Sequence, residues 1–134
     1  MRRLLQWFAV ALPAVCLLLA GAVCLAKSHG QKVHVQGYLI DNSCWSERDG
    51  KDVHSLLREH TKECLQMPDC TKSGYSIVTD AGSVYPLDAD SNTKVVAWID
   101  ATQRDDNWQV DAKGIWQDGK LDIKKIELQR APRH

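Results

Sequence analysis

The sequence lacks the short motifs that mark the common hydrolases and nucleotide-binding enzymes. It contains no Gly-x-Ser-x-Gly elbow, no phosphate-binding loop, no His-Glu-x-x-His helix and no paired-carboxylate signature. Internal repeats and low-complexity tracts are absent as well. Hydrolase and nucleotide chemistry therefore have no local support. We expect a binding or structural module rather than an enzyme, and assign no catalytic residue.

An excess of positive charge is also missing. The 134 residues include 17 Lys and Arg against 17 Asp and Glu, and the basic residues are scattered along the chain. A protein that binds a phosphate backbone needs a basic face that displaces counterions. We therefore expect no nucleic acid partner, and a protein or small ligand of unknown identity instead.

Charged side chains are almost absent from the first 26 residues. Arg2 and Arg3 precede an apolar run, residues 4–26, in which Gln6 is the strongly polar exception. This order is typical of an export signal, although about 20 apolar residues also suffice to span a bilayer. We predict residues 1–26 as a signal peptide or an N-terminal anchor in the inner membrane. Residues 27–134 would form a single exported, periplasmic or otherwise extracytoplasmic domain, touching a membrane only through residues 4–26 if these are retained.

The mature part shows strand patterns in five places. Apolar and polar side chains alternate, or β-branched residues lie between turn signals, in residues 33–40, 75–79, 84–87, 108–116 and 121–128. Gly37 predicts a bend or bulge within the first of these strands. Asp118-Gly119 predicts a tight hairpin turn between the last two.

Two further patterns complete the order of elements. The apolar positions of 121–128 shift from odd to even numbers, which predicts a bulge at Lys124-Lys125. Residues 94–102 fit a helix capped by Ser91 or Asn92. Five strands with a helix between the third and the fourth are the order of an OB-type barrel. We therefore predict a mainly β fold, an OB-like five-stranded barrel with a Cys-bearing helical insertion between strands one and two.

Within this insertion the apolar period becomes helical. From Asp52 onwards, residues at spacings of three and four share one face, namely Val53, Leu56, Leu57, His60 and Cys64. Pro68 disfavours helical geometry at the preceding residue, so this helix should end near Leu65 or Gln66. His60 and Cys64 would then project side by side, and Cys70 would turn back toward the helix end.

Cysteines are few outside the leader, which holds Cys16 and Cys24. Cys44, Cys64 and Cys70 remain, and in an exported domain they favour one disulfide plus a free thiol. A bridge from Cys44 to Cys64 or Cys70 would close a loop of about 20 to 26 residues, worth roughly 3 kcal/mol in the chain-entropy model. All three pairings stay open.

Metal binding and redox chemistry are the competing hypotheses for the same residues. Cys44, His60, Cys64 and Cys70 form a ligand set for Zn, or for Cu(I) with Met67 nearby. The absence of a Cys-x-x-Cys knuckle weakens this reading. Alternatively, the chain would be a periplasmic thiol–disulfide redox protein, in which His60 or Lys62 lowers the pKa of an attacking cysteine.

Other residues near these cysteines, and the tryptophans, fit structural roles. Asp41 is interpreted as a cap of the turn after the first strand rather than a base, and Trp45 as a cover for the cysteine cluster. The three tryptophans at periodic positions are predicted to be core residues rather than a stacking platform, namely Trp98, Trp108 and Trp116.

The segment around the cysteines is similar to a family of small exported bacterial proteins. The likeness lies in Asp41-x-x-Cys44 and in the pattern His-Thr-Lys-x-Cys-x-x-Met-Pro-x-Cys-x-x-Ser-Gly-Tyr at residues 60–75. The resemblance covers nearly the whole mature chain. It implies export and an OB-like fold, and it implies no particular reaction.

Overall fold

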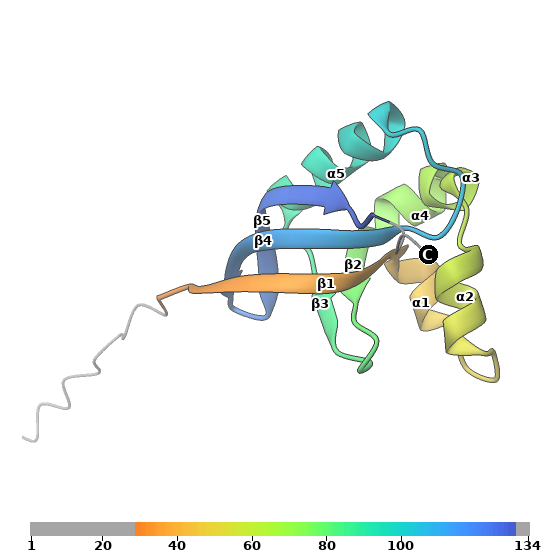
Figure 1. Ribbon diagram of the computed structural model, residues 1–134, viewed down its shortest axis with the longest axis horizontal. Coiled ribbons are helices and arrows are strands. Elements are labelled where there is room, and N and C mark those ends of the chain that lie inside the picture. The colour runs from red at the N-terminus through yellow and green to blue at the C-terminus, as the bar shows by residue number, and fades with distance from the viewer. Residues whose placement is uncertain (1–28, 131–134) are drawn as a thin grey trace, which may run out of the picture.

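Five strands form one antiparallel sheet in the computed structural model, which describes residues 29–130 (Figure 1). The strands are β1 Gln31–Asp41, β2 Tyr75–Val78, β3 Val84–Pro86, β4 Gln109–Gln117 and β5 Lys120–Leu128. They lie in the order β3-β2-β1-β4-β5. The β-rich prediction is confirmed. The predicted leader, residues 1–26, lies outside the described residues. No helix in residues 29–130 has the length and apolar character to cross a membrane.

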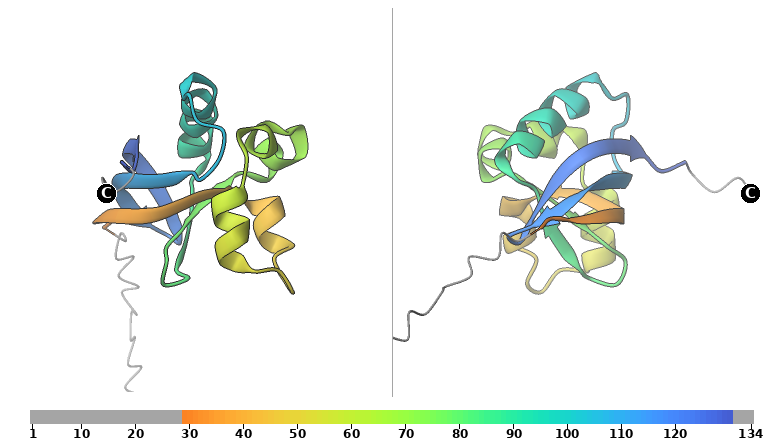
Figure 2. Two further views of the ribbon diagram at one scale, coloured as in Figure 1. Left: turned by 45° about the vertical axis from the view of Figure 1, so that its right-hand side comes forward. Right: turned by 90° about the vertical axis from the view of Figure 1, so that its left-hand side faces the viewer.

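The two edge strands of this sheet approach each other at one end. An isolated parallel bridge pairs Leu87, just after β3, with Leu121 in β5, and the Asp88 N–H donates to the Leu121 carbonyl at 3.1 Å. Within the described residues this contact does not extend into a ladder, so the sheet is twisted and unclosed (Figure 2).

A long helix, α5 Ala89–Ala101, connects β3 to β4. It begins five residues before the predicted start, because Asp88 caps it: the carboxylate Oδ1 accepts from the Ser91 N–H at 2.8 Å. Its buried face and the inner face of the sheet enclose the larger core, in which Trp108 is fully buried. Trp98 and Trp116 pack against this core, as predicted.

The β4–β5 hairpin follows the sequence closely. Asp118 and Gly119 both adopt positive φ, at 52° and 72°, as the two-residue turn requires. Lys113 pairs with Lys125 and Gly114 with Ile123, so Lys124 is the extra residue of a bulge. The predicted bulge is confirmed.

Gly37 is needed for a close approach between two strands. The pairing register of β1 runs through it without a slip, so the predicted bulge is absent. A Cβ at this position would lie 2.4 Å from the Val78 carbonyl oxygen. The neighbouring strand β2 therefore excludes any side chain here.

Four short helices replace the single predicted helix between β1 and β2. They are α1 Asn42–Ser46, α2 Val53–Glu59, α3 Lys62–Gln66 and α4 Pro68–Ser73. The predicted continuous helix from Asp52 to Gln66 is wrong, because the chain becomes extended at His60 and Thr61. The Thr61 hydroxyl accepts from the Cys64 N–H at 3.1 Å and so starts a new helix. The end at Gln66 before Pro68 is as predicted.

This helical insertion covers the outer face of β1 at its C-terminal end. The last five residues of β1 are all buried, in contrast to the alternation at its start. A second, smaller core forms there from Tyr38, Ile40, Leu57 and Val78, with Cys44 and Trp45 packed against it. Because helices cover this end of the strand, the polar residue that ends it, Asp41, is also buried.

Candidate thiol and metal site

The centre of the site is Asp41, which is fully buried where β1 passes into α1. One carboxylate oxygen accepts from the Cys44 N–H at 2.8 Å, so the predicted capping role is confirmed. The other lies 2.8 Å from His60 Nε2, and the His60 side chain is only 3% exposed. A buried carboxylate needs such partners to remain charged.

The partners of Asp41 determine its ionisation. Burial by itself raises the pKa of Asp41, but hydrogen bonds from His60, from the Cys44 backbone and from the Cys70 thiol outweigh it and lower the pKa to about 2. The carboxylate is therefore a permanent negative charge at neutral pH.

Two thiols lie against this charge. The ligand atoms of Asp41, Cys44 and Cys70 all lie within 4.8 Å of one another. Cys70 is buried, whereas Cys44 is half-buried and reaches the surface.

The elements that carry these thiols are tied together by backbone and side-chain hydrogen bonds. The Asn42 N–H donates to the Gly74 carbonyl at 2.8 Å. The Asn42 amide donates to the Ser73 carbonyl at 2.9 Å, and the Ser43 N–H donates to the Ser73 hydroxyl at 3.0 Å. The start of α1 is thus fastened to the end of α4, which fixes Cys44 opposite Cys70.

The surroundings of both thiols favour their protonated form. Burial raises the pKa of Cys70 to about 12, and the hydrogen bond to Asp41 and its charge add to the effect. Burial and the charge of Asp41 also raise the pKa of Cys44. The redox hypothesis, in which His60 or Lys62 lowers the pKa of an attacking cysteine, stays a prediction.

His60 and Cys64 take different places from those predicted. They lie on either side of the helix break, so they are not side by side on one helix. His60 bonds to Asp41. Cys64 is half-buried on α3 and lies outside the group of three ligand atoms. The three cysteines of residues 29–130 are free thiols, and a disulfide stays a prediction.

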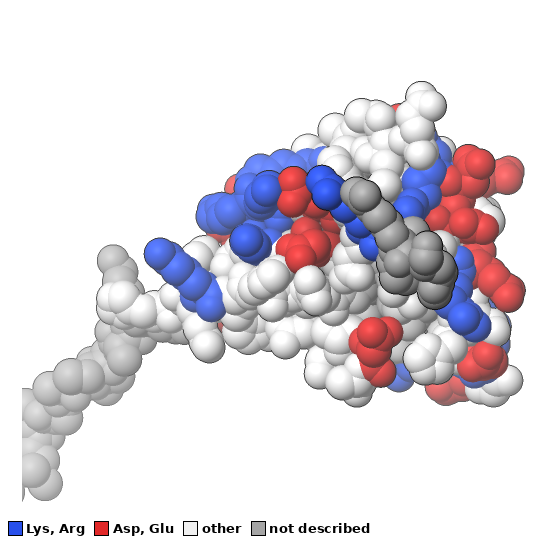
Figure 3. Space-filling model, in the orientation of Figure 1, with Lys and Arg blue, Asp and Glu red and all other residues white. Residues whose placement is uncertain are grey.

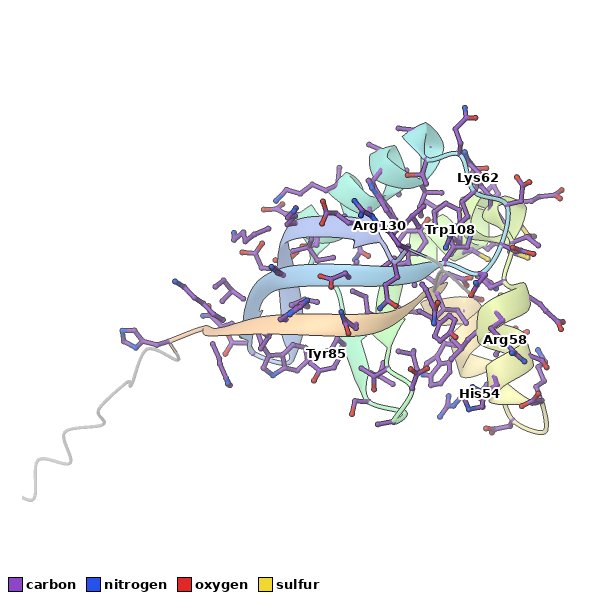
Figure 4. The ribbon with its side chains drawn as sticks, viewed as in Figure 1. His54, Arg58, Lys62, Tyr85, Trp108 and Arg130 are labelled. Atoms are coloured by element: carbon purple, nitrogen blue, oxygen red, sulfur yellow. The ribbon has the colours of Figure 1, made fainter. Side chains whose placement is uncertain are left out.

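The break at His60 is held from the far side by the loop before β4. The Asn107 N–H donates to the Arg58 carbonyl at 2.8 Å, and the Lys62 N–H donates to the Asp105 carbonyl at 2.6 Å. Figure 4 shows Arg58 and Lys62 on the helices next to this loop. The end of α2 and the start of α3 are therefore both anchored, which keeps the His60 imidazole on Asp41.

Trp45, the neighbour of Cys44 in α1, is in contact with Arg48. Trp45 packs on the smaller core, and the Arg48 guanidinium lies 4.6 Å from the centre of its ring. That Trp45 covers the cysteine cluster stays a prediction. On the face drawn in Figure 3, Lys and Arg are interspersed with Asp and Glu.

Sequence reasoning missed Asp41 as a member of the cluster. The signal was the spacing Asp41-x-x-Cys44, because a residue that caps a helix lies beside the backbone of the residue three positions on. Comparison with family models, with curated proteins and with solved structures finds no match. The functional conclusion therefore depends on this geometry.

Proposed function

We propose that this chain is an exported, OB-like binding module that holds a soft metal cation between Cys44, Cys70 and Asp41. The observation that carries the proposal is that two thiols and one buried carboxylate lie within 4.8 Å of one another. Ligand atoms placed about 2.0 to 2.3 Å from a tetrahedral Zn ion lie about 3.3 to 3.8 Å apart. A contraction of about 1 Å would therefore bring these three groups to one ion.

The electrostatics of the site favour a cation. Burial and the negative charge of Asp41 raise the pKa of both thiols. A bound cation would lower the pKa of both thiols, because it stabilises thiolates directly. His60 would then orient the Asp41 ligand through its hydrogen bond, as outer partners of metal ligands do.

The ligand types favour Zn²⁺ over Cu(I). Both metals accept thiolates, but Zn²⁺ also binds carboxylates, whereas Cu(I) prefers softer donors. Three protein ligands leave a fourth position, and Cys44 is half-buried, so this position can be reached from solvent. A small ligand or a side chain of a partner protein would bind there.

The OB-like part of the proposal is supported by the order of elements. The strand order β3-β2-β1-β4-β5, the helix between β3 and β4, and the contact of Leu87 with Leu121 agree with a barrel that closes between β3 and β5. Export is supported by the charge and hydropathy pattern of residues 1–26.

The alternative, a thiol–disulfide redox catalyst, is less favoured. An attacking thiol works best with a pKa near the ambient pH, and the pKa values of Cys44 and Cys70 are raised well above it.

A metal titration of the reduced protein tests the proposal. We expect binding of one Zn²⁺, measured by competition with a chromophoric chelator. Cys44→Ser and Cys70→Ser should each abolish this binding, and Asp41→Asn should weaken it.

Cys64→Ser is the matched control and should retain the affinity of the wild type. Circular dichroism would confirm that each variant folds. If the Cys44→Ser, Cys70→Ser double variant bound Zn²⁺ as tightly as the wild type, the proposed site would be refuted. If the wild type bound Cu(I) more tightly than Zn²⁺, the choice of Zn²⁺ would be refuted.

A further inference from the structure

The same two sulfurs are arranged for a second kind of chemistry. Cys44 and Cys70, together with Asp41, form a group whose ligand atoms all lie within 4.8 Å of one another. They come from α1 and α4, which are 26 positions apart in sequence at these residues but are tied together at Asn42, Ser73 and Gly74. The backbone therefore already holds the two side chains opposite each other, and forming a bond requires movement of the side chains.

We propose that Cys44 and Cys70 form a reversible disulfide, and that this bond closes the metal site. The first part rests on geometry alone, and the second part rests on the proposed function. Metal binding would then depend on the redox state of the extracytoplasmic compartment, because a metal and a disulfide need the same two sulfur atoms.

The difference in exposure sets the order of events. Cys44 is half-buried, so an incoming disulfide reaches its sulfur, whereas Cys70 is 5% exposed and sheltered. The Cys44 sulfur loses its proton and attacks the incoming disulfide, which releases one thiol and leaves a mixed disulfide. The Cys70 sulfur then loses its proton and attacks the Cys44 sulfur, which releases the second thiol.

The reaction balances with a disulfide as the oxidant. One disulfide bond forms between Cys44 and Cys70 and one bond of the oxidant breaks. Two electrons pass from the cysteine pair to the oxidant, and the two cysteine protons end on the two thiols released. A small dithiol reductant reverses each step.

Cys64 gives the internal control for this pairing. It lies on α3, outside the group formed by Asp41, Cys44 and Cys70. Among the cysteines of residues 29–130, Cys64 should therefore be the one left as a free thiol after oxidation. This distinguishes the proposal from the two other pairings.

The test uses the full-length protein with oxidised glutathione as the oxidant, followed by alkylation and peptide mapping. A protease that cleaves before aspartate separates the three cysteines, because Asp49 lies between Cys44 and Cys64, and Asp69 lies between Cys64 and Cys70. We expect a cross-linked pair of peptides containing Cys44 and Cys70, and an alkylated peptide containing Cys64. The Cys64→Ser variant should form the same cross-link.

A second arm measures Zn²⁺ binding before oxidation, after oxidation, and after reduction again. We expect loss of binding on oxidation and full recovery on reduction, and Zn²⁺ added beforehand should slow the cross-link. A bridge through Cys64, or no bridge, overturns the inference. Zn²⁺ retained by the oxidised protein overturns the coupling. A cross-link between Cys44 and Cys70 in a protein that binds no Zn²⁺ when reduced overturns the proposed function and leaves the disulfide in place.

Discussion

Asp41 combines a structural and an electrostatic role in one side chain. One oxygen caps α1 through the Cys44 N–H and the other holds His60. The same carboxylate raises the pKa of the two thiols beside it. Its removal should therefore change thiol reactivity, helix capping and acid stability together, and substitution by Asn separates these effects because Asn also caps helices well.

We expect Asp41→Asn to speed the alkylation of Cys44 and Cys70. Loss of the negative charge lowers the pKa of both thiols, and each unit of pKa multiplies the thiolate fraction by about ten at neutral pH. Iodoacetamide labelling at pH 8, followed by mass spectrometry of peptides, measures each cysteine separately. Cys64 is half-buried like Cys44, so its rate serves as the reference. An unchanged ratio of Cys44 to Cys64 labelling would contradict the role assigned to Asp41.

Acid stability should also depend on Asp41. Its pKa is about 2 in the folded protein, below the ordinary value of 3.8, so the unfolded chain binds the proton more tightly. The stabilisation is fully present above about pH 4 and is lost as the pH falls toward 2. It amounts to about 2 kcal/mol, since one pKa unit corresponds to about 1.4 kcal/mol.

Urea unfolding of the metal-free protein between pH 2 and 5 measures this effect. The free energy of unfolding of the wild type should fall more steeply with acidification than that of Asp41→Asn. If the free energy of unfolding fell equally with pH in the wild type and in Asp41→Asn, Asp41 would not be the source of the acid sensitivity.

At the scale of elements, the break between α2 and α3 positions His60. Thr61 caps α3, and substitution by Ala removes the hydroxyl that accepts from the Cys64 N–H. We expect Thr61→Ala to lower the free energy of unfolding by about 1 kcal/mol. Thr61→Ser keeps the hydroxyl and is the matched control. Chemical denaturation measures the free energy of unfolding of both variants. Equal values for Thr61→Ala and Thr61→Ser would mean that other contacts hold the break.

The strands could be predicted because their signals are local. Alternation in 33–40 and the Asp118-Gly119 turn depend only on neighbours in sequence, and so does the bulge at Lys124. The break at His60 and Thr61 could not be predicted, because the apolar period continues across it. Besides the local cap at Thr61, tertiary contacts hold it: Asp41, 19 residues away, bonds to His60, and the Asp105 carbonyl accepts from the Lys62 N–H.

The same reasoning explains the outcome for the site. Cys44, Cys70 and His60 were found from their chemistry, and the structure gathers them around Asp41. The place of Cys64 depended on the predicted continuous helix, and it changed when that helix divided. Asp41 was recognised as a cap, but its second partner depends on how the insertion folds over β1. Long-range contacts of this kind leave no periodic trace in the sequence.

At the scale of the whole molecule, the sheet is joined to α5 where its edges approach each other. Ser91 in α5 is fully buried, and its hydroxyl accepts from the Ile123 N–H of β5 at 2.7 Å. The bridge between Leu87 and Leu121 is close by in the sequence, because Leu87 just precedes α5 and Leu121 lies two residues before Ile123 in β5. Ser91 therefore satisfies a backbone donor at the point where β3, α5 and β5 meet.

We expect Ser91→Ala to destabilise the fold by about 1 to 3 kcal/mol, because it leaves the Ile123 N–H buried without an acceptor. Thr93→Ala is the matched control on the same helix: its hydroxyl donates to the Ala89 carbonyl at an exposed position, so its loss should cost less than about 0.5 kcal/mol. Hydrogen exchange of the Ile123 amide, together with urea unfolding, measures both effects. If Ser91→Ala matched Thr93→Ala in stability and left that amide protected, the contact between α5 and β5 would not hold the edges of the sheet together.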